Sequence, residues 1–225
     1  MVKSKFLILF VCLFFVGCSL FVKVPGCIKT EEGDYILHLI EYKDHNIPVN
    51  APINTDRSKF QEEYLYMEDW IVSNSEMEKI GKGIPRYQNC PKPSEDPADF
   101  GIRLTSLDAN INDPSLPGVG NMFSEFITLE KGVLSIRIEE YASEAEAVAS
   151  FDLWNNTYNA SIQSLIDFEP KNADESIYFF FIENPSSKVI HVRKGKYVLV
   201  MWDMTNEGES QKNIEVAELY LQRLN

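Results

Sequence analysis

Histidine is scarce in this sequence, and the motifs that carry most enzyme chemistry are missing from it. The 225 residues include three histidines, and none belongs to an HExxH or H-x-H arrangement, so a metallohydrolase has no support. No GxSxG elbow, GxxxxGK loop or strand–GxGxxG–helix unit occurs, which argues against familiar hydrolases and nucleotide-binding domains. We therefore expect no metal, no cofactor and no catalytic residue that the sequence alone can identify.

Basic residues are also few. The sequence has 21 lysines and arginines against 34 acidic residues, a net charge of −13. Such a surface repels phosphate backbones, so we do not expect nucleic acid as a partner. The charge either keeps the domain soluble and monomeric or attracts a basic partner protein or a cation.

The N-terminus carries the strongest pattern. A short basic segment is followed by an uninterrupted apolar run, Phe6–Val16, of the length expected for a signal-peptide core. The run leads into Val16-Gly17-Cys18, which resembles the lipobox of bacterial lipoproteins, although Phe15 stands where that family usually has leucine. The resemblance implies that residues 1–17 are a signal peptide and that Cys18 carries the lipid. An uncleaved transmembrane helix and an ordinary secretory signal are the alternatives.

The remaining cysteines fit an exported protein. Cys12 leaves with the leader and Cys18 takes the lipid, so Cys27 and Cys90 remain and are predicted to form a disulfide. The alternative is two unrelated thiols. A zinc site is disfavoured because no CxxC or HxxxH partner lies near either cysteine.

We expect residues 18–30 to form a tether and residues 31–225 to form a single α+β domain. Its proposed centre is an antiparallel sheet of about five to six strands backed by three to four helices. The segment 81–121 is expected to be mostly irregular, because six of the eleven prolines lie between Pro85 and Pro117. The strand-like segments are Tyr35–Tyr42, Phe100–Leu107, Met122–Leu129, Val133–Glu140, Ile177–Ile182, Lys188–Arg193 and Tyr197–Asp203.

Four local features add detail to this predicted fold. Two short turns predict hairpins, one at residues 130–132 and one at residues 194–195. Ser75 with Glu78 and Ser143 with Glu146 match the capping box that begins a helix. The run at Ile177–Ile182 is too apolar for an exposed strand. The alternation in the strands places Glu139 and His191 on solvent-facing sides.

These features favour two functions from different classes. The preferred one is a membrane-anchored envelope lipoprotein, outside the cytoplasm, that binds a protein and acts as an inhibitor or immunity-type factor. Its contacts with other molecules would be the membrane, through Cys18, and a basic protein. The alternative is an envelope hydrolase that uses a carboxylate pair on a glycan or wall substrate, for which Glu139 and Glu140 are one candidate pair.

Overall fold

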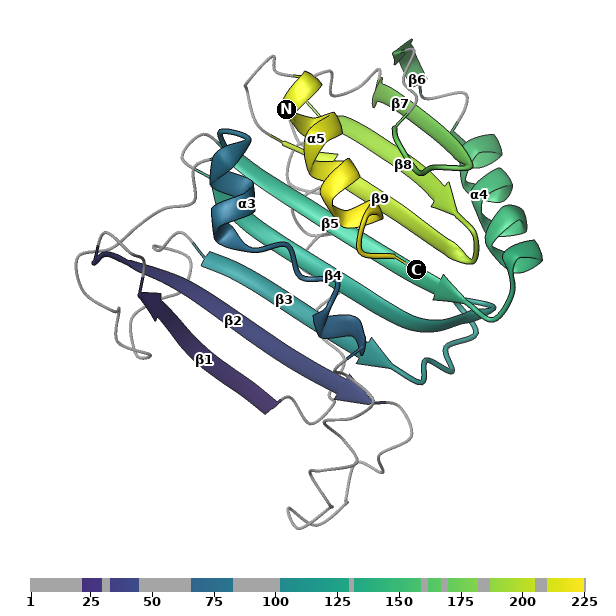
Figure 1. Cartoon of the computed structure of the whole chain (residues 1–225). Helices are drawn as coiled ribbons and strands as arrows, with labels where there is room; N and C mark the ends of the chain where they lie inside the picture. Colours follow the sequence, from purple (N-terminus) through teal and green to yellow (C-terminus); the bar gives the residue numbers. More distant parts are fainter. Residues whose placement is uncertain are drawn as a thin grey trace, which may run out of the picture.

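One nine-stranded sheet forms the centre of the molecule (Figure 1). The computed structural model describes residues 22–29, 33–44, 66–82, 102–129, 132–158, 162–166, 170–181, 187–204 and 210–224. The strands lie in the order β1-β2-β3-β4-β5-β9-β8-β7-β6. Within these ranges, no helix has the length and apolar character needed to span a membrane.

The strands and helices have the following bounds. The strands of the N-terminal half are β1 (Val22–Lys29), β2 (Tyr35–Asp44), β3 (Ile102–Ala109), β4 (Val119–Leu129) and β5 (Gly132–Tyr141). Those of the C-terminal half are β6 (Ile162–Ile166), β7 (Glu175–Phe181), β8 (Lys188–Lys194) and β9 (Tyr197–Asp203). The helices with full bounds are α3 (Asn74–Lys79), α4 (Glu144–Tyr158) and α5 (Ser210–Leu221).

The sheet is larger than the sequence predicted, and it is mixed rather than wholly antiparallel. The expected tether contains β1, which pairs with β2 from Val22–Tyr42 to Lys29–Tyr35, and β6 adds a strand at the other edge. β2 and β3 are parallel. More than 50 residues separate these two strands, enough for the crossover that parallel neighbours require. The prediction of an α+β domain built on a largely antiparallel sheet is confirmed at this coarser level.

The two predicted hairpins are confirmed. β4 and β5 pair down to Leu129 and Gly132, and β8 and β9 pair down to Lys194 and Tyr197. Gly195 has a φ of +55°, a left-handed conformation that glycine adopts without a Cβ clash, so it suits this tight turn. β5 and β9 then pair with one another and join the two halves of the sheet.

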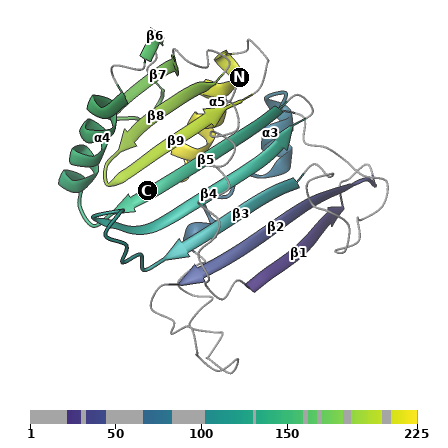
Figure 2. The ribbon, with the colours of Figure 1, turned by 180° about the vertical axis from the view of Figure 1, so that it is seen from behind.

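The two faces of the sheet are covered by different elements. Residues 66–82 and α5 pack on one face, here called the α5 face. α4 packs on the opposite face, the α4 face, over β5, β8 and β9. Figure 2 shows α4 beside β7 and β8, on the side of the sheet away from β1.

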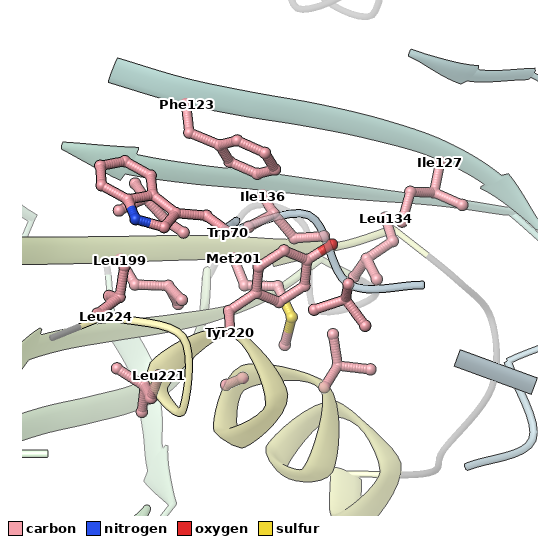
Figure 3. Packing of buried hydrophobic residues seen from close by; sticks show 14 of the residues in the cluster. Trp70, Phe123, Ile127, Leu134, Ile136, Leu199, Met201, Tyr220, Leu221 and Leu224 are labelled. Carbon is pink, nitrogen blue, oxygen red and sulfur yellow. The ribbon is translucent and has the colours of Figure 1, made fainter. Parts of the chain in front are cut away.

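Aromatic side chains link the elements on the α5 face (Figure 3). The Trp70 ring lies 6.4 Å from the Phe123 ring, and the Phe123 ring lies 6.0 Å from that of Tyr220. All three side chains are at most 1% exposed. Burial of this size stabilises the fold by about 1.5–3 kcal/mol for each large apolar side chain. This cluster therefore fixes α5 and residues 66–82 against the sheet.

One capping box lies where it was predicted and the other does not. The Ser143 hydroxyl accepts a hydrogen bond from the Glu146 amide at 3.3 Å and begins α4, as expected. The box assigned to Ser75 and Glu78 is wrong, because Ser73 and Glu76 make it, two residues earlier. The preceding segment turns at residues 69–70, and Trp70 and Val72 are buried between that turn and Ser73.

β7 lies inside the sheet, between β6 and β8, as its apolar sequence predicted. Tyr178 and Phe179 are fully buried, one on each face, while Phe180 is only half-buried. Within the middle segment 81–121, the strand predicted at Phe100–Leu107 is present as β3, and the start of β4, which was not predicted there, also falls in its described part.

Candidate functional site

The predicted lipidation and disulfide residues lie largely beyond what the structure describes. Cys18 and Cys90 are outside the described residues. The backbone of Cys27 lies in β1, opposite Leu37 of β2. The disulfide between Cys27 and Cys90 and the lipid on Cys18 therefore stay predictions.

Two of the histidines are buried, and His45 lies outside the described residues. The prediction that His191 faces solvent is wrong, because its side chain is only 1% exposed. It lies under α4, with ring centroids 4.4 Å from Phe151 and 4.5 Å from Trp154, and its Nδ1 is 3.0 Å from Asn155 Oδ1. Burial, followed by the nearby Arg137 charge, lowers the pKa of His191 to about 3. His191 is therefore a neutral core residue, and the apolar surface of α4 decides this.

Glu139 and Glu140 do not form a carboxylate pair. They are consecutive in β5, and side chains alternate along a strand, so they point to opposite faces of the sheet. Glu139 accepts a hydrogen bond from Tyr141 on the α4 face at 2.7 Å, whereas Glu140 accepts one from Asn121 at 2.8 Å. The prediction of a solvent-facing Glu139 is also wrong, since it is 5% exposed. Within the described ranges, no group of three or more histidine, cysteine or acidic residues could hold a metal ion.

The α5 face contains a buried polar cluster, here defined as His38, Asn74, Arg103, Thr105, Glu125 and Tyr220. Arg103 Nε donates to Glu125 Oε1 at 2.6 Å, and its Nη2 donates to Oε2 at 3.0 Å. The Thr105 hydroxyl donates to Glu125 Oε1 at 2.8 Å, and the Tyr220 hydroxyl donates to Oε2. Both oxygens of this carboxylate are thus satisfied inside the protein, as a buried charge requires.

Burial and the charge of Arg103 set the protonation states of Glu125 and His38 in this cluster. Burial alone would raise the pKa of Glu125, but the Arg103 guanidinium and the hydrogen bonds together hold it below its usual value. Burial, with the Arg103 charge, lowers the pKa of His38 to about 4, so the imidazole is neutral at neutral pH. Its Nε2 lies 2.8 Å from the Thr105 hydroxyl. The cluster therefore contains one ion pair and a neutral histidine.

The cluster has a structural role. Arg103 also donates to the Val72 carbonyl and to Asn74 Oδ1, at 2.6 Å for the second contact. These hydrogen bonds connect residues 66–82 to the sheet, and the hydrogen bond from Tyr220 to Glu125 connects α5 to it. Arg103 and Glu125 are at most 1% exposed, so a ligand would have no access to them.

Exposed carboxylates gather at a different place, around Arg193 near the start of α4. Arg193 Nη1 lies 3.1 Å from Glu144 Oε1 and 3.2 Å from Asp174 Oδ2, and its Nη2 lies 2.9 Å from Glu175 Oε1. The three acidic side chains are 67%, 47% and 41% exposed, so they face solvent as well as the guanidinium. One positive charge among three carboxylates leaves the group negative.

Two further acidic residues extend this group along α4. Glu146 and Asp152 are exposed on the helix, and the sequence of α4 contains no lysine or arginine. We call Glu144, Glu146, Asp152, Asp174 and Glu175 the acidic surface. Leu153, which follows Asp152, is 68% exposed and adds an apolar side chain to it.

Part of the proline-rich middle lies beside the acidic surface. The loop at residues 110–118 lies beside the start of α4, because the Gly118 carbonyl accepts a hydrogen bond at 3.2 Å from the amide of Ala142, two residues before the helix, and Gly118 lies close to the Glu146 side chain. Pro114 and Pro117 in this loop are exposed, and the Asp113 side chain accepts a hydrogen bond from the Ser115 amide at 2.8 Å in a tight turn within it. The sequence indicated both an acidic surface and proline-rich loops, but it could not show that they are adjacent.

No protein-family model matches the sequence, and no curated protein matches it significantly.

Proposed function

We propose that this protein is a lipid-anchored envelope lipoprotein that binds a basic partner protein through the acidic surface, as an inhibitor or immunity-type factor would. The observation that carries the proposal is the group of exposed carboxylates around Arg193 and along α4. Electrostatic complementarity of this kind speeds association and selects partners of opposite charge.

Two further features support a binding role. Exposed Leu153 lies within the acidic surface and can become buried on contact, which adds apolar area to a charged interface. The loop at residues 110–118 is held by the Asp113–Ser115 hydrogen bond, by the Ile111 amide on the Gly120 carbonyl and by the Ala142 amide on the Gly118 carbonyl, so a partner would meet a largely pre-formed surface. The alternative hydrolase gains no such support, because Glu139 and Glu140 lie on opposite faces of the sheet.

The binding part is tested by a pull-down from the native envelope fraction, with charge-reversed variants as bait. Glu144→Lys with Asp152→Lys should reduce recovery of the partner at least tenfold. High salt should do the same for the unmodified protein, since the Debye length shrinks to about 3 Å at 1 M. Asp69→Lys with Glu215→Lys, on the other face of the molecule, makes the same change in net charge and should leave recovery unchanged. Equal recovery with both variants would contradict the proposal.

The anchoring part is tested separately at Cys18. Cys18→Ser should abolish lipid labelling and leave a full-length precursor, because the residue that receives the lipid is gone. Release of a mature chain from this variant would show that an ordinary secretory signal operates instead.

A further inference from the structure

We infer that β1 lies directly on the headgroup layer of the membrane, so that the bilayer covers this edge of the sheet and the acidic surface faces away from it. The inference rests on the proposed lipidation of Cys18. It adds an orientation, and it assigns the β1 edge to one occupant, a membrane surface that carries anionic lipid.

The first argument is the length of the chain between the lipid and the sheet. Val22, the first residue of β1, follows Cys18 by four residues. Four residues span at most about 14 Å when fully extended. The nine strands, at about 4.8 Å for each of eight spacings, extend over about 38 Å. The anchor is therefore short relative to the domain and holds Val22, the start of β1, near the bilayer.

The second argument is charge. β1 contains Lys23 and Lys29 and no acidic residue, and Lys29 is exposed. The rest of the exported chain is strongly acidic, because 34 acidic residues remain after Lys3 and Lys5 leave with the leader. Anionic headgroups attract lysines near the surface and repel the acidic body of the protein. Both effects favour the same orientation, with β1 toward the membrane.

The third argument is that β1 is poorly suited to pair with a strand of another protein. Pro25 lies within β1, opposite Leu39 of β2, and proline cannot donate a backbone hydrogen bond to a further strand. Proline and lysine are residues that protect sheet edges from such pairing. β6, at the other edge, has the sequence IQSLI, which contains neither proline nor a charged residue. A polar membrane surface suits the β1 edge better than a partner strand does.

The orientation leaves the acidic surface free. Glu175 begins β7, and seven strand spacings, about 34 Å, separate β7 from β1. α4 lies beside β7 and β8, and β1 forms the opposite edge in both views (Figures 1 and 2). A partner approaching from the side away from the membrane would therefore meet the acidic surface first.

The test is neutron reflectometry of the natively lipidated protein on supported bilayers, made either of zwitterionic lipid alone or with added phosphatidylglycerol. The measured quantity is the water gap between the headgroups and the protein layer. We expect a gap below about 14 Å on both bilayers. A larger gap on the anionic bilayer would overturn the inference.

An insertion distinguishes the effect of the short tether on the gap from the effect of the lysine charges. Twenty Gly/Ser residues placed between Leu20 and Phe21 add a flexible reach of about 25 Å. The gap should then open on the zwitterionic bilayer and stay closed on the anionic one. Lys23→Gln with Lys29→Gln in the insertion variant should open the gap on both bilayers. As a control, Lys79→Gln with Lys171→Gln in the insertion variant removes the same amount of charge elsewhere. The gap on the anionic bilayer should then stay closed.

The outcomes distinguish this inference from the lipidation on which it rests. An intact mass without acyl chains would remove the proposed anchor and this inference together. A lipidated protein whose insertion variant responds equally on both bilayers would overturn the role of β1 alone. Thermal unfolding of each variant, compared with the unmodified protein, shows that the domain is still folded.

Discussion

Arg103 on β3 and Glu125 on β4 form an ion pair whose Nε and Oε1 atoms are 2.6 Å apart and whose side chains are 1% and 0% exposed. The pair lies between the sheet and the two elements that cover the α5 face. Arg103 also donates hydrogen bonds to the Val72 carbonyl and to Asn74, and Glu125 accepts one from Tyr220. The stability of this layer should therefore depend on both charges.

Removing one member of the pair should be strongly destabilising. Arg103→Met leaves the Glu125 carboxylate buried without its counter-charge, and the expected loss is about 3–5 kcal/mol in urea unfolding. Arg103→Met with Glu125→Leu should lose clearly less than the two single variants added together. Arg223→Met breaks the part-exposed ion pair with Glu76 and should cost at most about 1 kcal/mol. Additive losses for the buried pair would show that the two charges act independently.

His191 should make the protein sensitive to acid. Its folded-state pKa, lowered to about 3, lies below the unfolded value of 6.5, so the unfolded chain takes up the proton more readily. Stability is lost as the pH falls below about 6.5, and the loss levels off near the folded pKa. At pH 4 this one residue should account for about 3 kcal/mol of lost stability relative to pH 8.

The measurement is the difference in unfolding free energy between pH 8 and pH 4, for the unmodified protein and for His191→Phe. The variant should show a smaller difference, and the part that persists includes the contribution of His38, whose pKa is also lowered. An unchanged difference in His191→Phe would mean that His191 accepts its proton without opening the contact with α4.

Phe179 and Phe180 are neighbours in β7 that should respond differently to substitution. Phe179 is fully buried on the α4 face, with its ring 5.4 Å from that of Trp154, whereas Phe180 is half-buried on the α5 face. Phe179→Ala should cost about 3–5 kcal/mol because it leaves a cavity. Phe180→Ala should cost less than half of that. Equal losses in denaturant unfolding would contradict the burial assigned to the two rings.

The predicted disulfide can be tested with a thiol titration. Cys27 and Cys90 should not react in the folded, non-reduced mature protein, and they should react after reduction. A bridge that closes a loop of about 60 residues stabilises the fold by roughly 4 kcal/mol in the chain-entropy model. Cys27 belongs to β1, so reduction should increase hydrogen exchange in β1 before it does so in β5 and β9. Two reactive thiols in the non-reduced protein would show that the bridge is absent.

Local sequence patterns predicted the local parts of the fold. The hairpins β4–β5 and β8–β9, the start of α4 at Ser143 and the interior position of β7 all follow from residues close together in the chain. The sequence did not predict β1, which was expected to be part of a tether. A segment with Pro25 and Gly26 has low strand propensity, and it becomes a strand by pairing with β2.

The acidic composition, the apolar run Phe6–Val16 and the strands with clear alternation were determined by the sequence itself, because each depends on residue type and short spacing. Only the tertiary structure decided which charges are buried and which are exposed. Glu125 and Tyr220 are 95 residues apart, and no pattern in the chain indicates that the phenol would complete the carboxylate's hydrogen bonds. Likewise, Glu144 and Arg193 meet only because α4 packs over β8. The cost of burying a charge depends on its neighbours in space, and the pairing of the strands determines those neighbours.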